Sequence, residues 1–70
     1  MGEFISNSVY TLRTKKGLTQ EELASKLAIT RQTVISIEKG NYTPSVLLAL
    51  KIALVFKVPA EDIFCISYEK

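Results

Sequence analysis

The stretch that decides the fold is "TQEELASKLAITRQTVISIEKG", Thr19 to Gly40. It predicts two short helices, residues 20–27 and 31–39, joined only by Ala28-Ile29-Thr30. Thr19 and Glu22 have the spacing of a capping box, in which each side chain accepts a hydrogen bond from the other residue's backbone amide. Thr30 is an N-cap residue for the second helix, and Gly40 ends it. The sequence therefore specifies two helices meeting at a tight turn.

The second of these helices has two faces. At about 100° per residue, Val34 and Ile37 fall on one apolar stripe. A separate outward face carries a mixture of guanidinium, amide, hydroxyl, ammonium and aliphatic groups: Arg31, Gln32, Ile35, Ser36 and Lys39. Taken alone, this composition also fits an ordinary solvated helix face.

The outward face suits the major groove of DNA. An Arg can donate two hydrogen bonds to guanine, a Gln can pair its amide with adenine, and an aliphatic group can contact the thymine methyl. Ala24 is small at the point where the two helices would cross. The short turn and this close crossing indicate a helix-turn-helix, with its second helix placed to read bases.

The rest of the chain adds helices on either side. One is expected over residues 8–16, stopped by Gly17, and one from Pro44 to about Phe56 with Thr43 as N-cap. A short final helix opens at Pro59. The end segments "EFIS" (3–6) and "FCISY" (64–68) are rich in β-branched and aromatic residues, so they either pair as strands or pack as coil. We expect one all-α, five-helix domain over residues 1–70, in which "MGEF" (1–4) also fits a vector remnant.

Composition excludes several classes of protein. The 70 residues include no His and one Cys, Cys65, so neither an internal disulfide nor a zinc site is expected. No catalytic constellation, cofactor motif, membrane span or room for a separate small-molecule domain is apparent. The net charge of +2 is unevenly placed: residues 11–42 carry six bases and three acids (6 − 3 = +3), whereas residues 43–70 carry three of each. We expect a cytoplasmic, non-enzymatic protein whose positive charge surrounds the second helix.

The pattern "LTQEELASKLAITRQTVISIEKGNYTPS" (18–45) resembles the lambda-repressor/Cro type of helix-turn-helix regulator, the Xre family, and the match extends from about Leu12 to Phe64. Among its members the chain is most similar to compact stand-alone repressors, some of which add a small sheet made from the two termini. The resemblance implies that double-stranded DNA is the partner. It implies base-reading residues Arg31, Gln32, Thr33, Ser36 and Ile35, phosphate-binding residues Gln20, Thr30, Lys39, Asn41 and Tyr42, and a structural ion pair between Arg13 and Glu38.

Two positions depart from the family pattern. Ala28 stands where the turn often has Gly, so a left-handed conformation there would be mildly strained. Ile35 stands where a polar residue is usual, and we expect it to contact a thymine methyl.

The helix after Pro44 carries Leu47, Lys51, Leu54 and Val58 opposite its expected core face of Ala49, Ile52, Ala53 and Phe56. Either the terminal strands or a second subunit could cover this side. We expect a homodimer whose interface includes Leu47, Leu54, Ile63 and Phe64.

The expected function is therefore a sequence-specific transcriptional regulator, a repressor that binds a palindromic operator as a homodimer. Two alternatives stay open. One is the antitoxin of a toxin–antitoxin pair, and the other is a protein-interaction module of the same fold that does not bind DNA.

Overall fold

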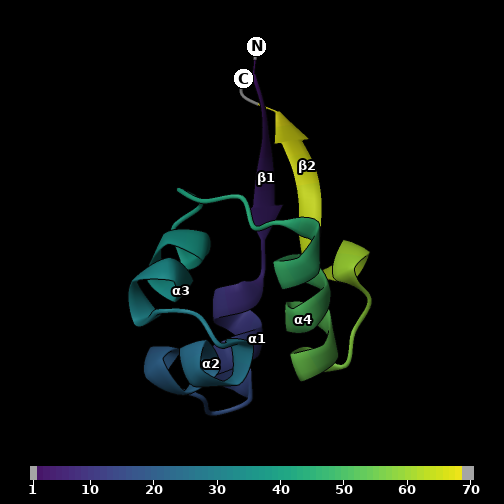
Figure 1. Ribbon diagram of the computed structural model, residues 1–70. Coiled ribbons are helices and arrows are strands. Elements are labelled where there is room, and N and C mark those ends of the chain that lie inside the picture. Colours follow the sequence, from purple (N-terminus) through teal and green to yellow (C-terminus); the bar gives the residue numbers. More distant parts are fainter. Residues whose placement is uncertain (1, 69–70) are drawn as a thin grey trace.

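The computed structural model describes residues 2–68, which form four α-helices, one 3₁₀ turn and two strands (Figure 1). Their order is β1 (Glu3–Asn7), α1 (Val9–Lys15), α2 (Gln20–Leu27), α3 (Arg31–Glu38), α4 (Val46–Phe56), η1 (Ala60–Asp62) and β2 (Phe64–Tyr68). Met1 of the possible vector remnant lies outside the described residues, whereas Glu3 and Phe4 belong to β1.

The five-helix count is wrong. The expected final helix is only the three-residue turn η1, which follows the extended Pro59. The chain enters β2 at Phe64, so too few residues remain between the proline and the strand for a helix to propagate.

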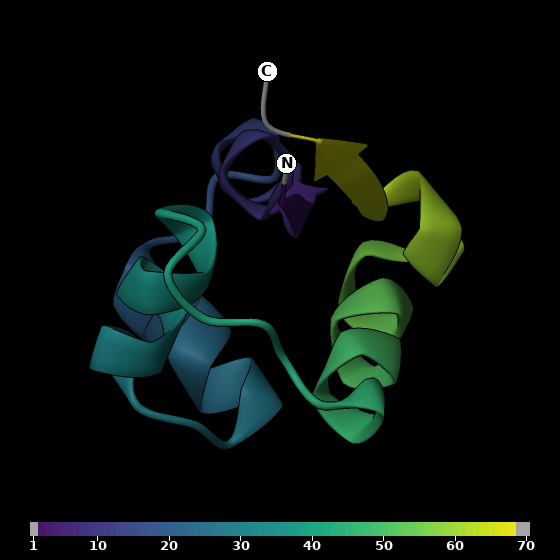
Figure 2. The ribbon, with the colours of Figure 1, turned by 90° about the horizontal axis from the view of Figure 1, so that it is seen from above.

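The helices enclose one apolar core. Its most completely buried side chains come from α1, α2, α3 and α4: Val9, Leu23, Leu27, Val34, Ile37 and Ile52. Burying a side chain of this size contributes about 1.5–3 kcal/mol. Seen from above, α2 and α3 lie on one side of the molecule and α4 on the other, and the segment after α3 crosses between them (Figure 2).

Helix α4 begins two residues later than expected. Ser45, not Thr43, is its N-cap, and the Ser45 hydroxyl accepts a hydrogen bond from the Leu48 amide at 3.1 Å. Pro44 therefore precedes the helix. The core face is centred on Leu48, Ile52 and Phe56, and the two alanines of the expected face, Ala49 and Ala53, are only half-buried at its edge. With 11 residues, α4 is the longest helix, and no helix within residues 2–68 is long and apolar enough to cross a membrane.

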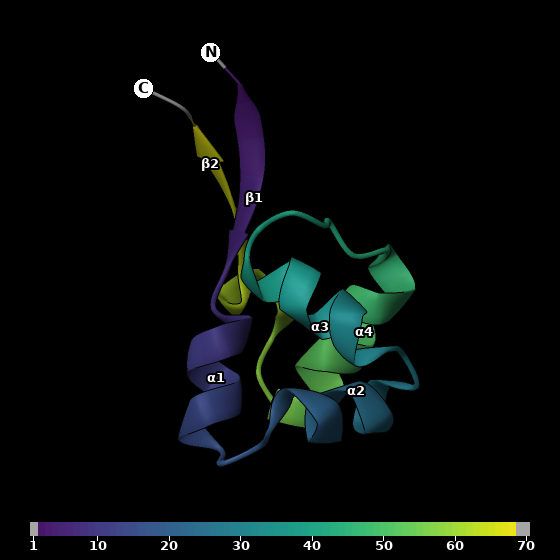
Figure 3. The same cartoon turned by 90° about the vertical axis from the view of Figure 1, so that its left-hand side faces the viewer.

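The terminal strands pair, which confirms the sheet left open by the sequence. β1 and β2 are antiparallel, with Ile5 opposite Ile66 and Ser6 opposite Cys65. The Ser6 hydroxyl contacts the Ser67 hydroxyl at 2.9 Å and the Cys65 thiol at 3.0 Å. The sheet extends away from the helices (Figure 3).

Candidate nucleic-acid interface

The turn between α2 and α3 is built from backbone conformation and one hydroxyl. Ala28 adopts the left-handed conformation (φ 58°, ψ 43°), and the next amide, that of Ile29, donates to the Ala24 carbonyl at 3.0 Å. Thr30 then turns to an extended conformation, and its hydroxyl accepts from the Thr33 amide at 3.1 Å. Ala24 is buried, as the close packing of α2 against α3 requires. These residues set the direction in which α3 leaves α2.

Helix α3 has the two faces that its sequence predicts. Val34 and Ile37 are each 1% exposed and hold the helix to the core. Arg31 and Gln32, at the first turn of the helix, are exposed, as is Lys39 just after it. Figure 3 shows α3 on the side of the molecule that faces the viewer.

The other three expected reading residues, Thr33, Ile35 and Ser36, are half-buried. The Thr33 hydroxyl lies 2.9 Å from the hydroxyl of Thr30, the N-cap residue of α3. The two hydroxyl groups are therefore hydrogen-bonded to each other. Ile35 lies outside the apolar core cluster, and part of its surface reaches solvent. The freest polar groups on α3 are therefore those of Arg31 and Gln32.

Three of the expected phosphate-binding residues follow α3 directly. Lys39, Asn41 and Tyr42 are exposed. The backbone amide of Asn41 donates to the Ser36 carbonyl at 2.9 Å, which fixes this segment against the end of the helix. Gly40 makes the bend with φ 79°, a conformation that favours glycine.

The fourth, Gln20, opens α2 and is half-buried. Its Nε2 donates to Glu38 Oε1 at 3.1 Å. The sequence pattern for Gln20 predicts a phosphate contact and does not reveal this hydrogen bond, because the two residues are 18 positions apart.

Glu38 is also the partner of Arg13. Arg13 Nε donates to Glu38 Oε2 at 2.6 Å, and Nη2 donates to Oε1 at 3.3 Å. The two side chains are 10% and 5% exposed, respectively. The hydrogen bond that Arg13 donates to Glu38 raises the pKa of Arg13 above its ordinary value. Arg13 Nη1 also donates to the Leu18 carbonyl at 2.8 Å, which ties α1 to the residues leading into α2.

Two further polar residues position the helices in roles that their local sequence does not predict. Asn7 Nδ2 donates to the Ile37 carbonyl at 2.9 Å, while Asn7 Oδ1 accepts from the Val9 amide at 3.0 Å, so this side chain joins the start of α1 to α3. Lys51 Nζ donates to the Leu27 carbonyl at 2.7 Å, at the C-terminal end of α2. Lys51 was expected beside Leu47 and Leu54, opposite the core face of α4; it is instead half-buried and directed to the end of α2. A capping-type residue just before a helix was the available signal for Asn7, and a single charge in an apolar helix was the signal for Lys51.

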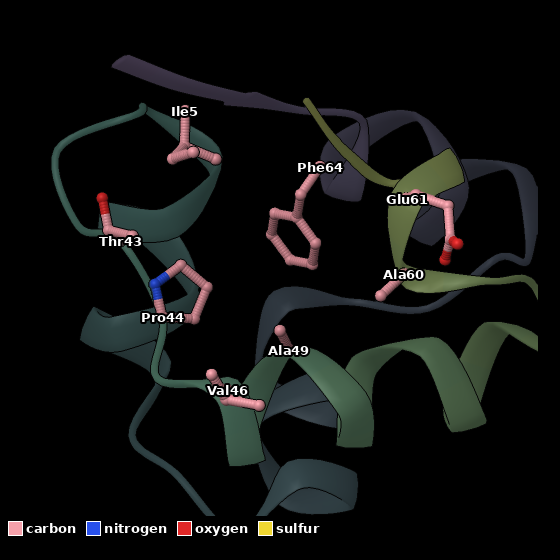
Figure 4. A pocket seen from close by; sticks show the side chains of 8 residues that line it. All are labelled: Ile5, Thr43, Pro44, Val46, Ala49, Ala60, Glu61 and Phe64. Atoms are coloured by element: carbon pink, nitrogen blue, oxygen red, sulfur yellow. The ribbon is translucent and has the colours of Figure 1, made fainter. Parts of the chain in front are cut away.

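An apolar surface lies on α4 and beside it. Val46, Leu47 and Leu54 are 77%, 71% and 77% exposed. Next to Val46 is a groove lined mainly by apolar side chains from β1, β2, α4 and the segment before it (Figure 4): Ile5, Pro44, Val46, Ala49 and Phe64. We call these exposed α4 side chains and the groove the α4 surface.

Three of the four residues expected at a dimer interface lie on the α4 surface, and the fourth is buried. Leu47 and Leu54 are exposed on it, and Phe64 lines the groove. Ile63, in contrast, is 3% exposed and belongs to the core of its own chain, so its side chain is not available to a partner. Val58, expected on the same side of the helix, is half-buried against the core.

The fold and this arrangement of α2, turn and α3 define a helix-turn-helix domain. The family model described as "Helix-turn-helix" matches residues 9–63. An uncharacterised HTH-type transcriptional regulator of Bacillus subtilis, YgzD, is 48% identical over 65 residues, which are 93% of this chain and 98% of that protein. An uncharacterised HTH-type transcriptional regulator of Methanocaldococcus jannaschii is 53% identical over 60 residues, 86% of this chain and 91% of that protein.

A solved structure is also similar. The restriction-modification controller protein C.AhdI of Aeromonas hydrophila superimposes with a TM-score of 0.70 at 33% identity, over 77% of this chain and 78% of that one. The chain belongs to the helix-turn-helix family of DNA-binding transcriptional regulators, in its lambda-repressor/Cro (Xre) type.

Proposed function

We propose that this chain is a repressor that binds a palindromic operator as a homodimer and reads it with α3. The observation that carries the proposal is the exposed pair Arg31 and Gln32 at the first turn of α3, a helix whose opposite face is fully buried. An α-helix fits the major groove, and these two side-chain types can each make two hydrogen bonds to one base.

The reading residues have different tasks in this proposal. Arg31 and Gln32 contact base edges. Thr33, whose hydroxyl is shared with the N-cap, offers its methyl group or a phosphate contact, and Ser36 lies one turn further along the helix. Ile35 contacts a thymine methyl, which would remove its partly exposed surface from water.

The phosphate contacts lie at both ends of the helix-turn-helix. Gln20 and the first amides of α2 face the backbone on one side, and the Thr30 cap lies between the two helices. Lys39, Asn41 and Tyr42 follow the backbone on the other side. Such contacts fix the register of α3 in the groove without reading sequence.

A second copy of the chain is the proposed occupant of the α4 surface. Exposed apolar side chains at Val46, Leu47 and Leu54 continue into the groove at Phe64 and make one apolar area on and beside α4. Figure 1 shows α4 on the opposite side of the molecule from α3. A partner seated there leaves the reading residues uncovered. Two-fold symmetry would place two recognition helices on half-sites about 34–36 Å apart, one turn of DNA.

Repression follows from occupancy in this proposal. A dimer bound in the cytoplasm to an operator that overlaps a promoter excludes polymerase without any catalytic step or cofactor. The closely related alternative, an antitoxin, would use the same DNA contacts and offer the α4 surface to a toxin.

The experiment that tests the proposal is selection of bound duplexes from a random-sequence pool, followed by sequencing. The expected result is an enriched palindrome, whose half-site spacing reports the dimer geometry. Weak, salt-sensitive binding without any enriched sequence would overturn sequence-specific regulation and favour the interaction-module alternative. An enriched single half-site would overturn the dimer but keep the DNA-reading helix.

A further inference from the structure

One polar cluster joins the three helices on which DNA binding would depend. Arg13 comes from α1, Gln20 from α2 and Glu38 from α3. Glu38 Oε1 accepts from both Gln20 Nε2 (3.1 Å) and Arg13 Nη2 (3.3 Å), while Oε2 accepts from Arg13 Nε (2.6 Å). Arg13 therefore neutralises the charge of the Glu38 carboxylate, and the hydrogen bond from the uncharged Gln20 amide does not change that balance.

The hydrogen bond from Gln20 fixes which way its amide points. A carboxylate only accepts hydrogen bonds, so the NH₂ end of the Gln20 amide, and not its carbonyl end, must face Glu38. Of the two amide hydrogens, one is used in this bond and one remains for another acceptor. Without Glu38, the amide could rotate by 180° at little cost.

The oriented amide lies beside an open hollow between the starts of α2 and α3. The hollow is lined by Arg13, Thr19, Gln20, Glu21 and Arg31. It thus connects the N-terminal end of α2 with Arg31, the first reading residue of α3. The capping box occupies the amides of Thr19 and Glu22 but not those of Gln20 and Glu21. A DNA phosphate placed there would meet the remaining Gln20 hydrogen.

We propose that Glu38 is a positioning residue for DNA binding: it holds the Gln20 amide in the orientation that donates to a phosphate, and Arg13 cancels the charge that would otherwise repel that phosphate. This inference rests on the proposed function. It gives the Arg13–Glu38 pair a role in recognition besides joining α1 to α3.

The test is a double-mutant cycle on DNA affinity with Glu38→Gln and Gln20→Ala. In Glu38→Gln, Arg13 Nε retains the side-chain oxygen, so an NH₂ group faces Gln20 and the amide must turn or separate. Affinity for a random-sequence duplex is measured well below each variant's unfolding temperature. Glu38→Gln also leaves the positive charge of Arg13 uncompensated, which favours DNA in both backgrounds, so the readout is the difference between the two backgrounds. The substitution should be about two- to tenfold less favourable to binding when Gln20 is present than in the Gln20→Ala background, the effect of one lost hydrogen bond. In the Gln20→Ala background only the change of charge beside Arg13 remains, because there is no amide left to position.

The outcomes separate the inference from the proposed function. Equal effects of Glu38→Gln in both backgrounds would overturn the positioning role and leave Glu38 as a structural partner. A wild-type protein that binds no duplex at all would overturn the proposed function itself. Should Glu38→Gln fail to fold, Glu38→Asp keeps the charge for Arg13 and withdraws the carboxylate from Gln20 by one methylene, so the same cycle can be run with it.

Discussion

At the scale of single residues, Ala28 shows how a short turn is made without glycine. Its left-handed backbone is disfavoured for residues with a Cβ by about 1–2 kcal/mol. Glycine would avoid this cost, but it loses more conformational entropy on folding, which costs about 0.5–1 kcal/mol. The family pattern therefore marked a position of real strain. The packing of α2 against α3 holds the strained conformation in place.

Ala28→Gly should consequently raise the free energy of unfolding, by up to about 1.5 kcal/mol. Ala53→Gly, in the right-handed interior of α4, is the matched control and should lower it by about 1 kcal/mol. Urea denaturation of both variants measures the difference. A loss of stability in Ala28→Gly would show that the methyl group contributes more than its strained backbone costs.

Gln32 and Lys39 are expected to act differently on DNA. Gln32→Ala should cost about 1–3 kcal/mol on the selected operator and relax preference at one base pair, because it removes a contact to a base edge. Lys39→Ala should weaken binding to all duplexes alike and reduce the salt dependence by about one phosphate. Binding measured on the operator, on single-base variants and across a salt series distinguishes the two. An equal loss of affinity for all duplexes in Gln32→Ala would mean that this side chain contacts the DNA backbone and not a base.

The sequence predicted which side chains of the helix-turn-helix point to the core and which point to solvent. It did not predict their hydrogen-bond partners. Helical geometry separates Val34 and Ile37 from Arg31 and Gln32 without any knowledge of the rest of the molecule. The partner of Gln20 or Lys51, in contrast, is set by how three helices pack, and no local pattern encodes the distance between residues 18 or 24 positions apart.

At the scale of elements, prediction succeeded where capping chemistry was unambiguous. The Thr19–Glu22 capping box and the Thr30 cap place the starts of α2 and α3 correctly. The start of α4 was misplaced because Thr43-Pro44-Ser45 offers two capping residues, and the structure uses the second. The fifth helix failed because the pairing of β2 with β1, a long-range interaction, takes the chain away from helix at Phe64.

Asn7 joins the start of α1 to α3, so removal of its side chain should weaken the attachment of both helices. Asn7→Ala deletes the bonds to Ile37 and Val9, and we expect a loss of about 1–2 kcal/mol in the free energy of unfolding. Asn41→Ala, at an exposed position, is the control and should stay within about 0.5 kcal/mol of wild type. Thermal or urea denaturation measures both. Equal stabilities of the two variants would mean that water replaces Asn7 without cost.

The capping box of α2 predicts a response to acid. The hydrogen bond that the Thr19 backbone amide donates to the Glu22 carboxylate is the main cause that lowers the pKa of Glu22. A carboxyl group whose pKa is lower in the folded state contributes stability above its ordinary pKa, and this contribution disappears as the pH falls through the lowered value. The contribution is small because Glu22 is fully exposed to solvent.

Glu22→Gln keeps an acceptor for the capping box but does not titrate. Its thermal unfolding midpoint should therefore fall less steeply than that of wild type as the pH falls below 4.5, the ordinary pKa of a Glu. Parallel curves for the two proteins would contradict this assignment.

At the scale of the whole molecule, the α4 surface decides between monomer and dimer. Leu54→Glu should shift the protein to a monomer in equilibrium sedimentation, because it would bury a charge at the proposed interface. It should weaken operator binding while leaving the free energy of unfolding of the monomer nearly unchanged. Thr11→Glu, at an exposed position on α1, is the control. A wild-type protein that is monomeric at tens of micromolar would contradict the dimer.

The sheet has a consequence for the order of folding. Ser6 and Cys65 are 59 residues apart, and closing so long a loop in an unfolded chain costs on the order of 4 kcal/mol of entropy. The helical contacts are mostly local and can form first. Once the helices assemble, the Ser8 amide bonds to the Ile63 carbonyl at 3.0 Å, so the two strands start side by side and only have to zip outward. The kinetic nucleus is therefore expected in the helix-turn-helix and α4, with the strands joining after the rate-limiting barrier.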